Sequence, residues 1–226
     1  MNLRKMVAMI REFRRGTPLG DVAVLKFDAL SAPPKGINEK LGALHGYAPG
    51  ADLATLRQLS PGSLGREYAD FLDRNGIELL QMSPGIVERF RDNPYVLRYT
   101  QTHDLHHVLT GFDTGLPGEI GVHAFVVAQG AGAGGPALLW FARFFHPLIS
   151  PSQARKIWHN IRVGQAMGRR AELVLAQPIE SWFEEPLFRV RQRLGIPTDP
   201  AAAGVIQSGR SLVAEWLHGA PKARAA

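Results

Sequence analysis

The feature that most constrains this fold is a set of apolar residues at helical spacing, interrupted at intervals by glycine and proline. The clearest unit spans residues 60–77. Turn residues open it, Leu64, Tyr68 and Phe71 share one helical face, and an Asn-Gly pair ends it. The same spacing recurs in residues 154–171, and no segment of useful length alternates apolar and polar residues. The pattern predicts an all-α fold, a helical bundle with short loops.

The length of the chain favours one compact domain. It has 226 residues, near the upper end of the usual one-domain range, and 45% of them are hydrophobic, which is enough to bury a core. We therefore predict a single helical domain over residues 1–226. Residues 199–226 are expected to form a C-terminal extension, and its tail "HGAPKARAA" is expected to be disordered.

Composition narrows the chemistry before any motif is considered. The chain has no cysteine, which excludes disulfides, thiolate nucleophiles and cysteine-ligated metal sites. Its formal charge of +6 favours polyanionic partners. No helix-turn-helix, zinc-finger or aromatic RNA-binding pattern accompanies that charge, so no nucleic-acid partner is expected and anionic lipid is preferred.

Two segments bear on membrane contact. Residues 122–149 are apolar, but "GAGAGGP" interrupts them and they carry Arg143 and His146, so they predict no transmembrane helix. One helical stripe near the N-terminus consists of Leu3, Met6, Val7, Ile10 and Phe13. A basic amphipathic helix of this kind suits a membrane surface or a transit peptide. The first expectation, however, is a helix that packs this stripe on the core.

The stretch "QTHDLHHVLTG" carries the strongest chemical signal. Residues 94–111 are expected to form one helix around it. On that helix His103, Asp104 and His107 project at about 0°, 100° and 40°, within one arc. The two histidines are four residues apart, the spacing at which two imidazoles can meet one metal ion. His106 projects at about 300° and is expected to flank the site rather than bind.

A second carboxylate can reach this site only if the chain reverses. On a continuous helix Glu119 would lie about 18 Å beyond His107, too far to share an ion. The intervening "VLTGFDTGLPG" breaks the helix, because it contains three glycines and a proline. Asp113 or Thr114 is expected to cap a second helix that begins near Pro117 and returns Glu119 to the histidines.

Together His103, Asp104, His107 and Glu119 form a mixed nitrogen and oxygen ligand set between two consecutive helices. Such a set suits zinc, iron, manganese or cobalt and does not choose among them. Two carboxylates neutralise a divalent ion, and a position left open would admit water or substrate. A structural alternative stays open at this point, in which the histidines pack in a core without metal.

Three other motifs share these letters. An H-E-x-x-H protease needs a glutamate where this chain has Asp104. The paired His103-Asp104 resembles HD phosphohydrolases, but the further histidines and aspartate that those enzymes need are missing. The H-x-x-H-H box of membrane desaturases also fits, yet those proteins carry several boxes among transmembrane spans. None of the three is favoured.

The sequence resembles the coenzyme Q (ubiquinone) biosynthesis protein 4 family. The signature of that family, H-D-x-x-H, eleven residues, E, is matched by His103, Asp104, His107 and Glu119. Flanking segments agree, among them "PGSLGREYADFLDRNGI" upstream and "PLFRVRQRLGI" downstream. The resemblance runs over about residues 26–196. It departs from the family at "FDTG", where proline is more usual.

The resemblance implies an all-helical protein that binds a divalent metal, usually described as zinc, through these four residues. Iron, manganese and cobalt stay open. It also implies contact with isoprenoid lipid, peripheral attachment to a membrane surface and association with other ubiquinone-biosynthesis proteins; a homo-oligomer is compatible. The expected location is the cytoplasmic side of a bacterial inner membrane, or alternatively the matrix side of the mitochondrial inner membrane. His123 lies outside the signature and is expected to be a core or surface histidine.

The reaction implied for the family is oxidative decarboxylation. A prenylated 4-hydroxybenzoate loses its carboxylate and gains a hydroxyl at the same ring carbon. We therefore expect a lyase of the 4-hydroxy-3-methoxy-5-polyprenylbenzoate decarboxylase type. No base apart from the metal site is assigned, and no lipid-binding residue is named. The competing expectation is a non-catalytic module that presents lipid-tailed intermediates to partner enzymes and uses the metal structurally.

Overall fold

The structure, a computed structural model, describes residues 2–31, 33–42, 52–132 and 134–208. Within these ranges it contains helices and no named strand, so the all-α prediction is confirmed. The α-helices are α1 (Leu3–Arg14), α2 (Leu19–Leu30), α3 (Ile37–Gly42), α4 (Leu53–Arg57), α5 (Leu64–Asn75), α6 (Pro84–Arg89), α7 (Pro94–Thr110), α8 (Leu116–Ala128), α9 (Gly135–Ile149), α10 (Ala154–Arg170) and α11 (Leu187–Arg193). Three short 3-10 helices are η1 (Pro151–Gln153), η2 (Val174–Ala176) and η3 (Ile179–Trp182).

Most helix ends follow the glycine, proline and capping signals of the sequence. The side chain of Ser63 accepts a hydrogen bond at the start of α5, and Gly76 ends that helix in the left-handed region with φ 64°. One signal differs from its expectation. The Ser-Pro-Ser segment opens the 3-10 turn η1 instead of capping α10 directly, and Ser150 makes no side-chain capping bond.

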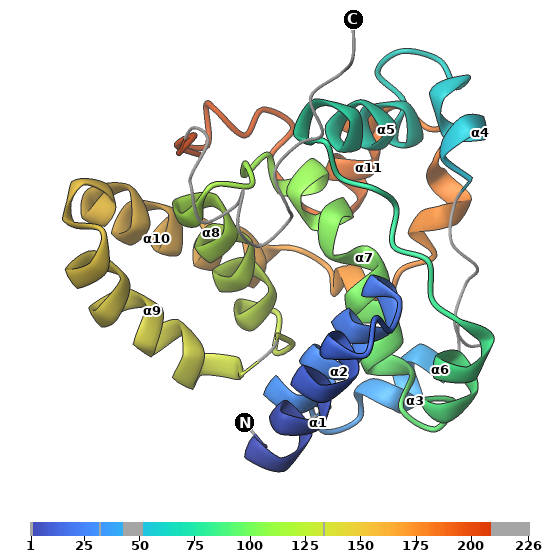
Figure 1. Ribbon diagram of the computed structural model, residues 1–226. Helices are drawn as coiled ribbons and strands as arrows, with labels where there is room; N and C mark the ends of the chain where they lie inside the picture. Colours follow the sequence, from blue (N-terminus) through green and yellow to red (C-terminus); the bar gives the residue numbers. More distant parts are fainter. Residues whose placement is uncertain (1, 32, 43–51, 133, 209–226) are drawn as a thin grey trace, which may run out of the picture.

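Helix α7 runs through the middle of the molecule, and it is buried along most of its length (Figure 1). Helices α2, α3, α5 and α8 pack against it. Arg98 is buried in α7; its guanidinium donates to the carbonyl oxygens of Leu175 and Gln177 and pairs with Glu180. Each guanidinium nitrogen therefore has a partner, as a buried charge requires, and the segment that carries η2 and η3 is tied to α7.

Two apolar clusters form the core of the described residues. The larger one surrounds α7 and includes Leu72 of α5, Tyr95 of α7 and Phe125 of α8. The smaller one lies between α8, α9 and α10 and consists of Ile120, Ala124, Leu139, Ala142, Ile157 and Ile161. Helix α8 contributes to both clusters, so it couples the three-helix group to the rest of the molecule.

Helices α8 and α10 approach each other closely, as the two glycines of α10 predicted. A Cβ atom at Gly164 would lie 2.3 Å from the carbonyl oxygen of Gly121, and one at Gly168 would lie 2.2 Å from that of Phe125. Both distances are far shorter than van der Waals contact, so only glycine allows this approach. The two helices lie side by side in Figure 1.

The first helix differs from the expectation that its apolar stripe packs on the core. Helix α1 contains no buried residue. It lies on α2, where Met9 partly contacts the larger cluster and Lys5 pairs with Asp28 at 2.8 Å. The stripe residues that remain exposed are Leu3, Val7, Ile10 and Phe13. The face of α1 that meets the protein is therefore not its most apolar face.

Helix α9 also presents large apolar side chains to solvent. They are Trp140, Phe141, Phe144, Phe145 and Leu148. The helix has 15 residues. In the part of the chain that the structure describes, no helix is both long enough and apolar enough to cross a membrane, as the interrupted segment 122–149 predicted.

Candidate metal site

The chain reverses between α7 and α8 at a left-handed glycine. Gly111 has φ 76°, and its backbone N–H donates to the carbonyl oxygen of His107 at 2.8 Å. Phe112 follows and is buried against Gly121, where a Cβ atom would lie 2.7 Å from its ring. The reversal sends α8 back along α7 and places Glu119 in its first turn.

The expected caps of α8 are wrong in detail. Gly115, rather than Asp113 or Thr114, occupies the capping position, and it has no side-chain bond to offer. The Asp113 carboxylate instead accepts hydrogen bonds from the backbone and hydroxyl of Ser208. The reversal itself is confirmed, because it depends on the glycines and not on which polar residue caps the helix.

His103, His107 and Glu119 converge on one point. Glu119 Oε2 lies 3.3 Å from His103 Nε2, and Glu119 Oε1 lies 3.4 Å from His107 Nε2. One ligand atom from each of the three residues lies within 4.8 Å of the others, as a shared metal ion requires. His107 is buried, whereas the side chains of His103 and Glu119 are each 24% exposed. The site is therefore closed on one side and open on the other.

The hydrogen bonding of His107 suits a metal ligand. Its Nδ1 lies 3.1 Å from the carbonyl oxygen of Phe112, so Nδ1 is the nitrogen that carries a proton and donates. In the neutral ring, Nε2 then presents a lone pair toward the Glu119 carboxylate. Two electron-rich atoms face each other, and a cation between them removes the repulsion. The donor set of this site thus fits a divalent metal.

Without a metal cation, a proton on His107 Nε2 would remove the repulsion between this nitrogen and the Glu119 carboxylate. Burial lowers the pKa of His107, but Glu119 and Asp104 raise it by more, to about 9. The stacked ring of Phe71, with its centroid 5.6 Å away, fixes the orientation of the imidazole from the α5 side. His103 is held between the rings of Tyr99 and Phe27, at 6.3 Å and 6.2 Å.

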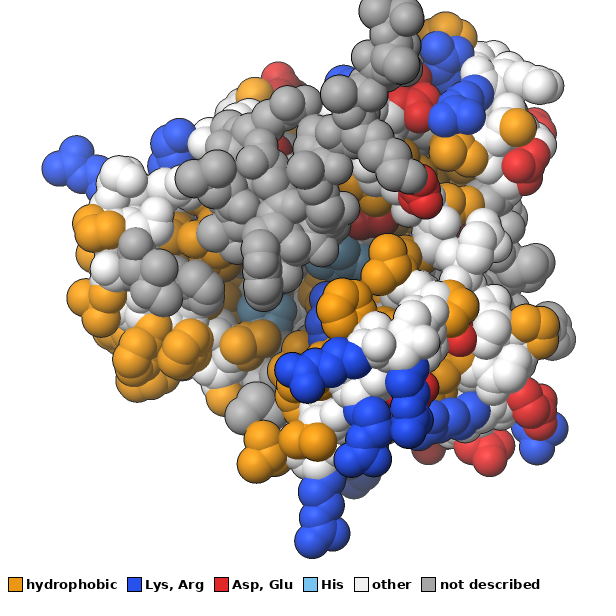
Figure 2. All heavy atoms as spheres, viewed as in Figure 1, with side chains coloured by type: hydrophobic (Ala, Val, Ile, Leu, Met, Phe, Trp, Pro, Cys, Tyr) orange, Lys and Arg blue, Asp and Glu red, His pale blue; other side chains and the backbone are white. Residues whose placement is uncertain are grey.

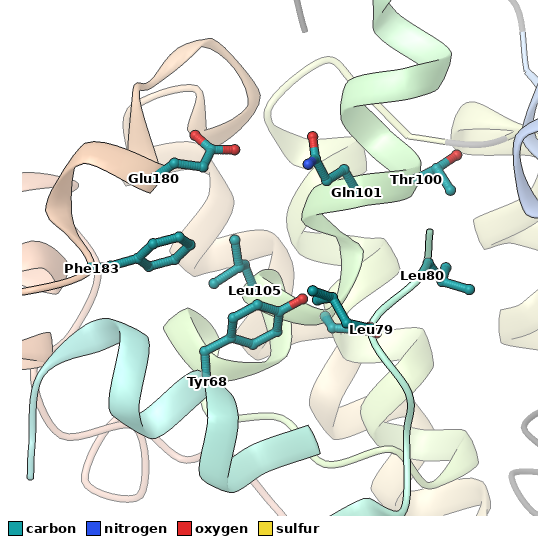
Figure 3. A pocket seen from close by; sticks show the side chains of 9 residues that line it. Tyr68, Leu79, Leu80, Thr100, Gln101, Leu105, Glu180 and Phe183 are labelled. Carbon is teal, nitrogen blue, oxygen red and sulfur yellow. The ribbon is translucent and has the colours of Figure 1, made fainter. Parts of the chain in front are cut away.

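Asp104 does not belong to the set of converging ligand atoms, although it lies on the same helix one residue after His103. Its side chain lines a small pocket beside α7 together with Tyr68, Leu105 and Phe183. Figure 3 shows Tyr68 and Phe183 on one side of that pocket, and their rings stack with centroids 6.3 Å apart. Asp104 still interacts electrostatically with His107, so its charge is part of the site.

The two other nearby histidines have different surroundings. His106 is buried on another face of α7, where its Nδ1 lies 2.6 Å from the carbonyl oxygen of Thr102 and burial lowers its pKa to about 3. It flanks the site, as the helical geometry predicted. Burial, followed by the proximity of His103, lowers the pKa of His123 to about 4. His123 therefore stands near the site as a neutral ring.

A segment from the far end of the chain supports the reversal, and sequence reasoning missed it. Residues 199–208 return to the α7–α8 connection. Pro200 packs so closely on Gly111 that a Cβ atom built at Gly111 would lie 2.5 Å from Pro200 Cβ. Asn160 of α10 donates to the carbonyl oxygens of Pro117 and Ile206 and joins the three elements. The predicted tail, "HGAPKARAA", lies outside the described residues.

The site opens into a hollow of the surface. Figure 2 shows histidine side chains inside the hollow, between the hydrophobic side chains over α9 and the basic and hydrophobic side chains over α1 and α2. Glu119 and His103 supply the exposed part of the site.

The fold and the site together define an all-α protein with a candidate metal site made of histidine and carboxylate side chains. The sequence matches the family model described as "Coenzyme Q (ubiquinone) biosynthesis protein Coq4" over residues 48–200. The chain belongs to this family. The matched residues include all four signature positions.

Relatives and a solved structure agree with this assignment. The chain is 36% identical to "Ubiquinone biosynthesis protein COQ4 homolog, mitochondrial" of Mus musculus and 37% identical to that of Homo sapiens, each over 66% of this chain and 56% of the relative. It is 31% identical to the protein of Yarrowia lipolytica, over the same shares. A crystal structure of a "Putative ubiquinone biosynthesis protein" from Nostoc punctiforme has the same fold, with a TM-score of 0.58, 24% identity, and coverage of 85% of this chain and 95% of that one. The chain thus spans little more than half the length of the mouse and human relatives.

Proposed function

We propose that this protein acts in ubiquinone biosynthesis as a metal-dependent oxidative decarboxylase of a prenylated 4-hydroxybenzoate at a membrane surface. The observation that carries the proposal is the convergence of His103, His107 and Glu119, two of which are partly exposed. Family membership supplies the pathway. The partial exposure of two of the ligands supports a catalytic site, because a closed structural site would cover all of them.

The proposed ligands are His103, Asp104, His107 and Glu119. The convergence of His103, His107 and Glu119 supports three of them, and the electrostatic interaction of Asp104 with His107 supports the fourth. When bound, a divalent metal would supply Lewis acidity toward the carboxylate or phenolate of the substrate. The chain holds His107 in the required tautomer through Phe112 and orients its ring with Phe71. Zinc is proposed first, and iron, manganese and cobalt are the alternatives.

The proposed reaction takes dioxygen as oxidant. The bond between the ring and the carboxylate breaks, carbon dioxide leaves, and one oxygen atom joins the same ring carbon. The other oxygen atom leaves as water when the product is released as the quinone, which balances the electrons. The residues around the site would exclude bulk water from the ring face, since Phe27, Tyr99 and Phe71 surround the two imidazoles.

An apolar tail has a candidate place in the structure. A pocket of about 410 Å³ lies where the ends of α2 and α8 meet the loop before α9. Leu30, Val127 and Pro136 line it, together with the backbone of several glycines. Helices α2 and α8 also border the metal site. We propose this pocket for part of the isoprenoid chain.

The membrane surface is proposed as the place of action. The exposed apolar faces of α1 and α9 flank the hollow (Figure 2), and basic side chains lie beside α1. Apolar insertion combined with positive charge is what a peripheral protein uses on an anionic bilayer. The proposed location is the cytoplasmic side of a bacterial inner membrane; the names of the animal and fungal relatives support the mitochondrial alternative.

The test compares metal-loaded and metal-free protein. Purification without chelator, followed by elemental analysis, identifies the metal. Both forms are then given a short-chain prenylated 4-hydroxybenzoate under oxygen. We expect carbon dioxide release and formation of the quinone only from the loaded form. Equal release from the two forms would exclude metal-dependent decarboxylation.

The alternative is a non-catalytic module that presents lipid-tailed intermediates to other ubiquinone-biosynthesis proteins. A homo-oligomer is compatible with this function. Exposed apolar side chains on α1 and α9 are the observation in its favour. A metal-free protein that stays folded and binds lipid but has lost turnover supports the enzyme. A protein that unfolds without metal, and has no turnover with it, supports the module.

A further inference from the structure

Lys26 of α2 lies near the metal site. Its ammonium nitrogen lies 5.0 Å from the centre of the Phe27 ring, and that ring lies 6.2 Å from the ring of His103. Both Glu119 and Asp104 interact electrostatically with the ammonium group. Within the described ranges, Lys26 has neither a hydrogen bond nor an ion pair. Its charge is therefore directed at the site without being tied to one partner.

The ammonium group is surrounded by protein but accessible. Burial lowers the pKa of Lys26 from its usual range, whereas Glu119 and Asp104 act in the opposite direction and favour the charged form. The residue as a whole is nevertheless exposed. These two facts agree for a group inside an open hollow. A ligand in the hollow can reach it.

With a divalent metal bound, the charges of the metal, Asp104, Glu119 and Lys26 add up to one net positive charge. Asp104 and Glu119 together neutralise the metal, and the histidines bind as neutral rings. Lys26 is then the cation that remains to complement a monoanion. An aromatic carboxylate is such an anion, and the Lys26 charge would balance it beside a metal site that is itself neutral.

We propose that Lys26 binds the carboxylate of the aromatic substrate and makes the site prefer an acid over the corresponding phenol. This inference rests on the proposed function, since it assigns the substrate-recognition group of the same site. Lys26 also lies outside residues 48–200, the part of the chain that the family model matches. It is a residue of this chain rather than a position of the shared signature.

Binding, measured without oxygen so that no turnover occurs, tests the proposal on the metal-loaded full chain. The probes are 3-geranyl-4-hydroxybenzoate and 2-geranylphenol, which differ only in the carboxylate. The variants are Lys26→Met, Lys26→Arg and, as a matched control, Lys40→Met, which removes an exposed lysine of α3. Metal content and thermal midpoint are measured for each variant, to establish that fold and metal are retained.

We expect Lys26→Met to weaken binding of the acid by about tenfold to about 100-fold, the range for a charge-assisted hydrogen bond. Binding of the phenol should stay unchanged. Lys26→Arg should keep most of the preference for the acid, and Lys40→Met should behave like the original protein. Under turnover, KM for the acid should rise while kcat changes little, because the contact is made in the ground state.

Three results would overturn the inference in different ways. If the original protein prefers the acid and Lys26→Met keeps that preference, Lys26 is not the recognition group, and the proposed function stands. If the original protein binds neither probe, the proposed substrate class is wrong and the role of Lys26 is lost with it. Equal weakening of both probes by Lys26→Met, with metal retained, also excludes carboxylate recognition.

Discussion

His107 concentrates the chemistry of the site in one side chain. It is buried, its Nδ1 is held by the Phe112 carbonyl, and its Nε2 faces Glu119 at 3.4 Å. His106, its neighbour in sequence, is equally buried but points elsewhere. Helical geometry alone separated the two histidines. The same geometry could not predict whether the Asp104 carboxylate reaches the site. It gives the position of Asp104 around the helix, about 100° from His103, but not the rotamer of the side chain.

The adjacent histidines provide a matched pair of variants. We expect His107→Asn to reduce metal affinity by at least about 100-fold. Loss of a residue that only hydrogen-bonds to a metal ligand costs up to about 100-fold, and loss of a ligand should cost at least as much. His106→Asn should destabilise the fold, since it disturbs a buried hydrogen bond, yet keep the metal. Isothermal titration with zinc compares them. Retained affinity in His107→Asn would exclude it as a ligand.

Asp104→Asn decides the fourth ligand. If Asp104 turns toward the ion, as the family signature implies, this variant should lose metal affinity to a degree comparable with Glu119→Gln. Titration of the two variants under the same conditions makes the comparison. Affinity unchanged by Asp104→Asn would restrict the ligands to the three residues that converge in the structure.

The raised pKa of His107 predicts that metal binding releases a proton. In the metal-free protein the imidazole, with a pKa of about 9, is charged at neutral pH, but a ligand must be neutral. Metal affinity should therefore rise with pH up to about 9. The stability of the metal-free protein depends on pH in the opposite direction. The pKa of His107 is higher in the folded protein than in the unfolded chain, where it is about 6.5. The stability that His107 contributes is therefore complete below a pH of about 6.5 and disappears as pH rises through about 9.

Calorimetry in two buffers of different ionisation enthalpy measures the released proton at neutral pH. The observed binding enthalpy should differ between the buffers by an amount that corresponds to about one proton. An enthalpy that does not depend on the buffer would show that His107 is already neutral before metal binds.

At the scale of the elements, the breaks in the sequence were more informative than its apolar stripes. Glycine and proline positions predicted the ends of α5, α7 and α8. The two glycines of α10 predicted its close packing on another helix, which is α8. The apolar stripe of α1 predicted a helix correctly, but the face that was expected to pack on the core is exposed. The spacing of apolar residues shows that they share a face and does not show whether that face contacts the core, a membrane or another protein. The support from residues 199–208 was invisible, since no local pattern indicates contacts with the distant loop after α7.

The α8–α10 contact gives a test at this scale. Gly168→Val should destabilise the protein by about 1 to 3 kcal/mol or more, because its side chain would enter the space of the Phe125 carbonyl oxygen. Displacement of α8 should also weaken metal binding through Glu119. Gly42→Ala is the control, since a Cβ atom there would meet nothing within 4 Å among the described residues outside its own helix backbone. Denaturant unfolding compares the two, and equal stability would contradict the close packing.

At the scale of the whole molecule, the apolar faces of α1 and α9 lie on either side of the hollow that contains the site (Figure 2). If both faces enter a bilayer, the hollow opens toward the lipid, and a prenylated substrate could pass into it without crossing water. This arrangement follows from where the helices pack, which neither helix reveals by itself.

Vesicle binding tests that arrangement. Trp140→Ser combined with Phe144→Ser should weaken binding to anionic vesicles by more than tenfold, since each side chain is about half exposed and buries a large apolar area on insertion. Phe188→Ser, which removes an exposed aromatic ring of α11, is the control. Binding should also weaken with salt. Equal binding of all three proteins would place the membrane contact elsewhere.

The support from residues 199–208 also sets an order of events during synthesis. The ribosome releases α7, with both histidines, long before it releases the segment that holds the α7–α8 connection through Ser208 and Ile206. Domains form from the N-terminal end as the chain emerges. Glu119 therefore gains its final position only after residues 199–208 have emerged, so the protein should acquire its metal only once that segment has folded back onto the α7–α8 connection.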